Sequence, residues 1–174
     1  MTAAPAGFEP PVYPYERLIG LKEKADAHPG GGVDLSIGTP GDPAPPAVVA
    51  ALASSGAEAG YPQSVGSQRY RTAAAGWMRR RLGVEVDPAA VAACVGTKEF
   101  VTTLPHWLHL RTPGRDTVLY PAVSYPSYEM GATLAGCRAV AVALDRHWRL
   151  DLDAVAPEDV ARALCLWVNS PGNP

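Results

Sequence analysis

The sequence predicts an α/β fold in which a mainly parallel sheet is covered by helices. Three features indicate it: short apolar runs of strand length, helical segments between these runs, and Pro- and Gly-rich loops directly after them. Apolar strands that alternate with helices are typical of parallel sheets with both faces covered. The 174 residues, 47% of them hydrophobic and 18% charged, are enough for a substantial core in one domain.

The first half of the chain is predicted to be mostly helical. An extended Ala- and Pro-rich arm is expected up to Tyr15, and a short strand over residues 33–37. Helices are expected over residues 16–27, 46–54 and 67–82. Pro46 suits the first turn of the second helix, and the Ser67 side chain can cap the third.

Strands and helices alternate from residue 91 onward. Apolar runs predict strands over residues 91–95, 117–120, 138–144 and 163–168. Helices are expected over residues 97–110 and 125–135, and a short one from residue 152 to 155. Pro105 is expected to kink the first of these helices, and Gly136 suits the C-terminal cap of the second. In such a sheet, ligands bind beyond the carboxyl ends of the strands.

Charge and cysteine content exclude several classes of function. The net charge is −2, and apart from the arginine run at residues 79–81 the basic residues are scattered, so no nucleic-acid or anionic-membrane surface is indicated. Cys94, Cys137 and Cys165 form no CxxC pair and are expected to be buried free thiols. No signal peptide, membrane span or metal-ligand motif is evident, so we expect a soluble, cytoplasmic protein.

A first candidate site lies where a predicted strand meets a predicted helix at Gly96-Thr97-Lys98. The backbone N–H groups at the start of a helix have no partner within the helix and stand at the positive end of its dipole. They therefore suit a phosphate group, to which the Thr97 hydroxyl can add a donor. The alternative is an ordinary strand–helix turn in which Thr97 is the N-cap.

Two further motifs follow strands at the same edge of the predicted sheet. Tyr125 and Tyr128 can present an aromatic face to a flat ligand, or can simply pack at a helix start. The run of residues 169–174, Asn-Ser-Pro-Gly-Asn-Pro, can place a side-chain amide donor, or can be a plain turn. A phosphate site, an aromatic plate and an amide donor together suit a flat, phosphorylated cofactor that carries a phenol, and pyridoxal 5'-phosphate (PLP) fits this description.

The order of these motifs resembles that of the class I/II aminotransferases, the fold-type I PLP enzymes. Residues 34–43 are similar to their N-terminal Gly-x-Pro loop, and Tyr61, Gly66 and Tyr70-Arg71 resemble a Tyr-x-x-x-x-Gly-x-x-x-Leu-Arg stretch with Tyr70 in place of Leu. The resemblance implies a partial three-layer sandwich, the N-terminal part of the aspartate-aminotransferase-like large domain. It divides the chain into an N-terminal arm and helix, residues 1–32, and an incomplete large domain, residues 33–174.

The resemblance also implies the roles of individual residues. The residues expected to bind the cofactor are Gly96, Thr97, Lys98, Tyr125, Asn173 and Tyr61. The first three hold the phosphate through their backbone, Tyr125 stacks on the pyridine ring, and Asn173 hydrogen-bonds the phenolic oxygen. Tyr61 reaches the phosphate of the partner subunit in a homodimer. Gly38 approaches the substrate carboxylate through its N–H group.

Within the family, the motifs are most similar to those of bacterial N-succinyldiaminopimelate aminotransferases. The matching runs are residues 36–43, 96–99 with Leu104-Pro105, and 124–129. The resemblance implies transamination of an amino acid with a 2-oxo acid, with succinyldiaminopimelate and 2-oxoglutarate as the pair, in lysine (diaminopimelate) biosynthesis. Aspartate, alanine or aromatic amino acids are alternative substrates, and a non-catalytic, truncated PLP-fold binding module is an alternative of another class.

No catalytic residue is predicted in this chain, because the family's Schiff-base lysine belongs to its later half. The chain has three lysines, Lys22, Lys24 and Lys98. The first two lie in a polar helix and are expected to be solvated, whereas Lys98 belongs to the phosphate site. The 174 residues alone are therefore expected to be inactive. A dinucleotide-binding fold is disfavoured, since no G-x-G-x-x-G follows a strand.

Overall fold

The computed structural model describes residues 12–56 and 59–174, which form two compact units. The sheet unit comprises residues 12–25 and 96–174, and the helical unit comprises the described residues from 26 to 95. The division of the chain at residues 32 and 33 remains a prediction.

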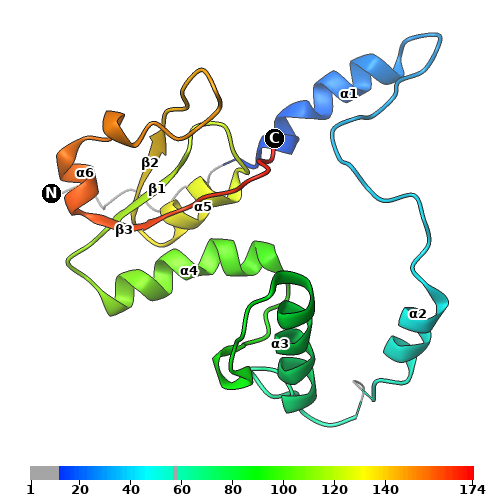
Figure 1. The fold of residues 1–174 in the computed structure, drawn as a ribbon. Helices are drawn as coiled ribbons and strands as arrows, with labels where there is room; N and C mark the ends of the chain where they lie inside the picture. Colours follow the sequence, from blue (N-terminus) through cyan, green and yellow to red (C-terminus); the bar gives the residue numbers. More distant parts are fainter. Residues whose placement is uncertain (1–11, 57–58) are drawn as a thin grey trace, which may run out of the picture. The chain divides into compact units, whose positions relative to one another are not determined.

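The sheet unit contains three parallel strands in the order β2-β1-β3. The central strand β1, Thr117–Pro121, pairs with β2, Arg138–Val142, on one side and with β3, Ala163–Leu166, on the other (Figure 1). Each connection between neighbouring strands passes through helix, as parallel pairing requires. The predicted α/β fold with a parallel sheet is thus confirmed, and β1 is its most buried strand.

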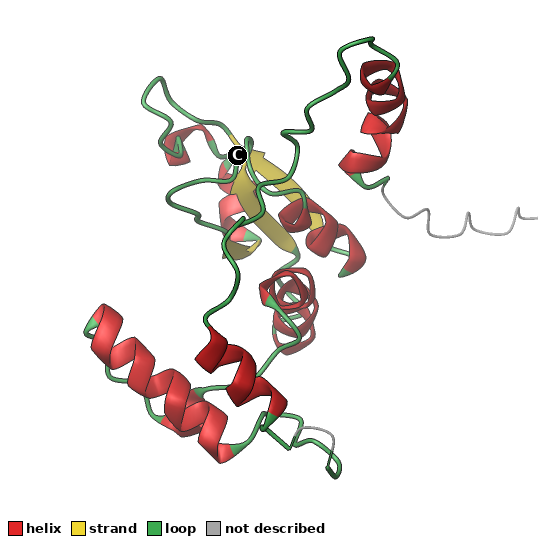
Figure 2. Ribbon diagram, turned by 90° about the vertical axis from the view of Figure 1, so that its right-hand side faces the viewer, coloured by secondary structure: helices red, strands yellow, loops and turns green. Residues whose placement is uncertain are grey.

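Two helices pack on each other and on this sheet (Figure 2). Helix α4, Thr97–Arg111, contacts β3, whereas α5, Ser127–Leu134, contacts β1 and β2. The core around them contains Val118, Ala132 and Cys137. A 3-10 helix η3, Leu152–Ala154, and a short helix α6, Pro157–Ala161, lie between β2 and β3. Gly136 follows α5 with a φ of 69°, which is the left-handed conformation expected at this position.

Helices α4 and α5 approach closely where Gly131 meets the backbone of Val101 and Thr102. Pro105 has no N–H group for the carbonyl of Val101, one turn earlier, and both residues are buried. A Cβ atom on Gly131 would lie 3.0 Å from that same Val101 carbonyl oxygen and 2.9 Å from Cα of Thr102. The Val101 carbonyl, which receives no hydrogen bond from Pro105, therefore lies next to Gly131, where α5 has no side chain.

The helical unit contains α2, Pro46–Ala53, α3, Gln68–Leu82, and the 3-10 helix η2, Pro88–Ala90. The Ser67 Oγ accepts a hydrogen bond from Tyr70 N–H at 3.1 Å, so the predicted N-cap of α3 is confirmed. In the N-terminal segment, η1, Pro14–Leu18, precedes α1, Ile19–Asp26. Most of the arm expected up to Tyr15, residues 1–11, lies outside the described residues. No helix among the described residues is long and apolar enough to cross a membrane.

Two strand predictions are wrong. Residues 33–37 and 91–95 have no strand conformation; Val33 and Val95 are 86% and 96% exposed. An apolar run indicates burial, but a strand also needs a neighbouring strand with which to exchange hydrogen bonds. Near Val95, the Ala93 N–H instead donates to the carbonyl of Val65, a loop residue, at 3.0 Å.

The expected burial of all three cysteines holds for only part of the set. Cys137 is buried and Cys165 is half-buried, and burial raises the pKa of the Cys165 thiol to about 11. Cys94 is exposed, because it lies in the 91–95 segment that no sheet covers. The two core thiols are therefore protonated and unreactive at neutral pH.

Candidate cofactor pocket

The N-terminus of α4 is capped by a residue without a side chain. Gly96 is the N-cap in an extended conformation, and no side-chain hydrogen bond caps the helix. The first helical hydrogen bond runs from Phe100 N–H to the Gly96 carbonyl at 3.3 Å, so the N–H groups of Thr97 and Lys98 precede the ladder. Thr97 is the first residue of the helix and not its cap, so the expectation of a turn with Thr97 as N-cap is wrong. The positive end of α4 is therefore suited to an anion.

An aromatic stack supports the next part of the site. The ring of Tyr128 is buried and stacks on Trp167, with 5.2 Å between centroids and 22° between planes. Trp167 also meets the edge of Phe100 at 6.2 Å. Tyr125 contacts Tyr128 edge to face at 6.4 Å and is itself only half-buried. The two tyrosines thus differ: Tyr128 packs in the core, and Tyr125 forms the outer end of the stack.

The loop after β3 provides two asparagines. In the orientation that satisfies both of its groups, the Asn169 side-chain amide donates to the Pro171 carbonyl at 3.2 Å and its oxygen accepts from Asn173 N–H at 3.3 Å. This pair of bonds folds the loop back on itself, so the backbone of Asn173 is held while its side chain is left to other partners.

These three elements enclose one pocket at the carboxyl ends of the strands. Its volume is about 310 Å³, and its lining consists of Thr97, Lys98, Val101, Tyr125, Tyr128, Asn169 and Asn173. Four of the six predicted cofactor residues are in this lining, and a fifth, Gly96, immediately precedes Thr97. The sixth, Tyr61, is 99% exposed in the helical unit, which also contains Gly38. The roles of Tyr61 and Gly38 remain predictions.

Tyr13 is a neighbour of this pocket that the sequence analysis did not identify. The Lys98 Nζ donates to the Tyr13 hydroxyl at 3.2 Å and lies 4.4 Å from the centroid of its ring. This hydrogen bond is the main reason why the pKa of Lys98 is raised. The pKa of Tyr125 is lowered, chiefly by a hydrogen bond with Tyr13 and further by Ser127 and the Lys98 charge. Tyr13 and Lys98 are 85 positions apart, so no local pattern joins them.

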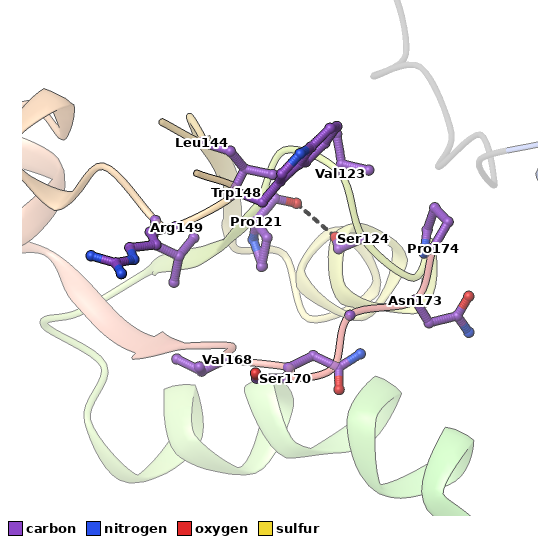
Figure 3. A pocket seen from close by; sticks show the side chains of 13 residues that line it. Pro121, Val123, Ser124, Leu144, Trp148, Arg149, Val168, Ser170, Asn173 and Pro174 are labelled. Atoms are coloured by element: carbon purple, nitrogen blue, oxygen red, sulfur yellow. Dashed lines mark hydrogen bonds between the residues drawn. The ribbon is translucent and has the colours of Figure 1, made fainter. Parts of the chain in front are cut away.

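A second pocket of about 390 Å³ adjoins the first and shares Asn169 and Asn173 with it (Figure 3). Trp148 and Arg149 line its other side, on the turn that follows β2. The Asp145 carboxylate accepts from Arg149 N–H at 2.9 Å and from His147 N–H at 2.7 Å, so it fixes this turn and its own pKa is lowered. The second pocket thus has an indole on the wall opposite the asparagine loop, whereas the Arg149 guanidinium points away from that loop (Figure 3).

Comparison with known proteins decides the family. Residues 31–174 match the family described as aminotransferase class I and II. The chain belongs to this family. Class I/II aminotransferases use PLP. The fit to this group is good in the structure itself, because a helix N-terminus without a side-chain cap suits the phosphate and the half-buried Tyr125 ring suits the pyridine.

Individual relatives agree with this assignment. This aminotransferase chain is 42% identical over 166 residues to 4-dedimethylamino-4-oxo-anhydrotetracycline transaminase OxyQ of Streptomyces rimosus, covering 95% of this chain and 43% of OxyQ. It is 41% identical over 166 residues to the probable aminotransferase Rv1178 of Mycobacterium tuberculosis, covering 94% and 37%. A solved structure, a probable N-succinyldiaminopimelate aminotransferase from Thermus thermophilus, superposes with a TM-score of 0.76 at 33% identity, covering 92% and 44%. The chain thus spans less than half the length of these proteins.

Proposed function

We propose that these 174 residues form the cofactor-binding part of a PLP-dependent aminotransferase, which moves an amino group between an amino acid and a 2-oxo acid. One observation carries the proposal: residues from three separate elements, the start of α4, the start of α5 and the loop after β3, line one pocket. PLP, when bound, supplies the electron sink that this chemistry needs. The protein supplies binding, orientation and electrostatics.

Each part of the pocket has a distinct task in this proposal. The N–H groups of Thr97 and Lys98 bind the phosphate, and the Lys98 ammonium adds a positive charge at the rim. The Tyr125 ring lies against the pyridine face, backed by the Tyr128–Trp167 stack. The Asn173 amide donates to the phenolic oxygen and stabilises its negative charge. Gly38 binds the substrate carboxylate, and Tyr61 reaches the phosphate of the partner subunit in a homodimer.

For the substrates, we favour succinyldiaminopimelate and 2-oxoglutarate, in the diaminopimelate route to lysine, in the cytoplasm. This choice is supported by the similarity of the sequence motifs to those of N-succinyldiaminopimelate aminotransferases and by the 33% identity to the Thermus protein. OxyQ carries the name of a tetracycline transaminase at 42% identity, which makes a different substrate the alternative to exclude. Assay of the full-length enzyme with succinyldiaminopimelate, aspartate, alanine and an aromatic amino acid distinguishes these choices, and a preference for any of the last three contradicts the substrate proposal.

The Tyr125→Ala substitution is expected to weaken PLP binding by about 1–3 kcal/mol, since it removes a stacking face and the apolar area that PLP covers. An absorbance titration with PLP measures the effect. The Trp107→Ala substitution is the matched control, because it removes an aromatic ring that is 63% exposed on α4 and outside the pocket lining. Equal affinities of the two variants would remove Tyr125 from the site.

In the full-length enzyme, the Asn173→Ala substitution is expected to shift the pH at which the absorbance of bound PLP titrates. The lost donor stabilises the charged phenolic oxygen, so the protonation equilibrium of the bound cofactor must move. Ser170→Ala is the control in the same loop, because Ser170 lines the adjoining pocket and not this one. An unchanged titration in the Asn173 variant would refute the role given to this amide.

A further inference from the structure

Tyr13 is the anchor of the N-terminal segment on the sheet unit. Among residues 12–56, Tyr13 is the most covered residue, although Tyr15 and Leu18 beside it are also only 37% and 40% exposed. Its backbone is fixed by the following turn, because its carbonyl accepts from Glu16 N–H at 2.9 Å and Pro14 begins η1. The turn into η1 thus fixes the backbone position of Tyr13.

Tyr13 lies directly behind the lining of the cofactor pocket, in contact with Lys98. Its hydroxyl accepts from the Lys98 ammonium at 3.2 Å, and its ring lies 4.4 Å from the same nitrogen. Tyr13 is also the main cause of the lowered pKa of Tyr125. Lys98 and Tyr125 both line the pocket, and Tyr13 does not. The Tyr13 phenol is therefore a common neighbour of two residues of the pocket lining, Lys98 and Tyr125.

The contact contributes little to folding. The Lys98 side chain is exposed, and exposed cation–π and polar contacts add little stability in water. The consequence of the contact is positional: without Tyr13, the flexible Lys98 side chain and the half-buried Tyr125 ring are each free to choose other rotamers. A pocket whose walls are already in place binds its ligand more tightly, because less ordering accompanies binding.

We propose that Tyr13 is a positioning residue of the cofactor pocket, whose hydroxyl fixes the Lys98 ammonium at the rim and holds the Tyr125 ring across the pocket. This inference rests on the proposed function, because it assumes that PLP occupies the pocket. The N-terminal segment is then part of the cofactor site and not only a leading arm.

The test uses the full chain with PLP as the probe and compares Tyr13→Phe with Tyr15→Phe. The first substitution keeps the ring over Lys98 and removes the hydroxyl, and is expected to weaken PLP binding by about fivefold, as the loss of one exposed hydrogen bond implies. Tyr15→Phe is the matched control, because the Tyr15 ring contacts Tyr13 at 5.5 Å but lies outside the Lys98 contact. Its affinity is expected to equal that of the parent chain.

A double-mutant cycle and a phenol titration separate positioning from mere packing. In the Tyr125→Phe background, Tyr13→Phe is expected to keep only the part of its effect that acts through Lys98, because the Tyr125 hydroxyl is gone. Without PLP, an ultraviolet titration of the tyrosines is expected to show the lowest-titrating phenol move to higher pH in Tyr13→Phe but not in Tyr15→Phe, because the bond that lowers the Tyr125 pKa is lost.

The outcomes distinguish failure of this inference from failure of the proposed function. If the parent chain binds PLP and Tyr125→Ala weakens it, but Tyr13→Phe binds normally with an unchanged phenol titration, the positioning role is wrong and the cofactor pocket stands. If the parent chain binds no PLP, the proposed function fails, and the role of Tyr13 toward PLP fails with it.

Discussion

Replacing Gly131 by alanine is expected to destabilise the protein by about 1–3 kcal/mol, as insertion of a methyl group into a closed contact does. Intrinsic preference alone gives the opposite sign, since alanine is favoured over glycine inside a helix by about 1 kcal/mol. The new Cβ would lie 2.9 Å from Thr102 Cα, 3.0 Å from Val101 O and 3.1 Å from Thr102 O. All three are backbone atoms of α4, which cannot rotate away as a side chain can, so the steric effect outweighs the preference.

The same substitution is expected to reach the pocket. Helix α4 must move outward to admit the methyl group, and α4 carries Thr97 and Lys98 at its N-terminus. Urea unfolding measures the stability, and PLP titration of the folded variant measures the change at the pocket. Gly114→Ala is the control, because Gly114 has a negative φ and nothing lies within 4 Å of its added Cβ. A Gly131 variant as stable as the Gly114 variant would contradict the close contact of α4 and α5.

Local patterns predicted much of the fold. The Ser67 cap, the left-handed Gly136 and the strands of the three-stranded sheet each depend on residues within a few positions of one another, and each is present. Strand lengths were overestimated: the segment expected over residues 138–144 ends at Val142, and the one expected over residues 163–168 ends at Leu166. Helix α6 was missed, because only five residues form it and its apolar spacing is too short to be periodic.

The incorrect or missing predictions concern residues whose structure depends on partners distant in the sequence. The apolar segment 91–95 has the composition of a strand but lacks a strand neighbour among the described residues. The pocket could be anticipated in part, because two of its three motifs follow β1 and β3, and the carboxyl ends of parallel strands meet at one edge. The third motif, at the start of α4, reaches the same edge without the strand that was expected before it. The role of Tyr13 could not be anticipated, because Tyr13 and Lys98 are 85 positions apart. A Tyr-Pro pair in an N-terminal arm matches no motif that would indicate a binding site.

The 174 residues alone are expected to transfer no amino group to 2-oxoglutarate, and borohydride reduction with PLP is expected to leave Lys98 without a stoichiometric label. Attack on PLP needs a neutral amine close to the reactive carbon of the cofactor. The Tyr13 hydrogen bond raises the pKa of Lys98 above its ordinary value, so the ammonium form is favoured even further at neutral pH. Lys22 and Lys24 are exposed in α1 and line no part of the pocket.

Mass spectrometry of the reduced chain gives the decisive measurement. Traces of label spread over Lys22, Lys24 and Lys98 are expected from exposed amines, and a Lys98→Gln variant is expected to lower the total only in proportion. Tyr13→Phe sharpens the test: it removes the bond that keeps Lys98 protonated, so labelling of Lys98 is expected to rise slightly while amino-group transfer stays absent. Stoichiometric label on Lys98 of the parent chain, accompanied by transfer to 2-oxoglutarate, would make Lys98 the catalytic amine and overturn its assignment to the phosphate.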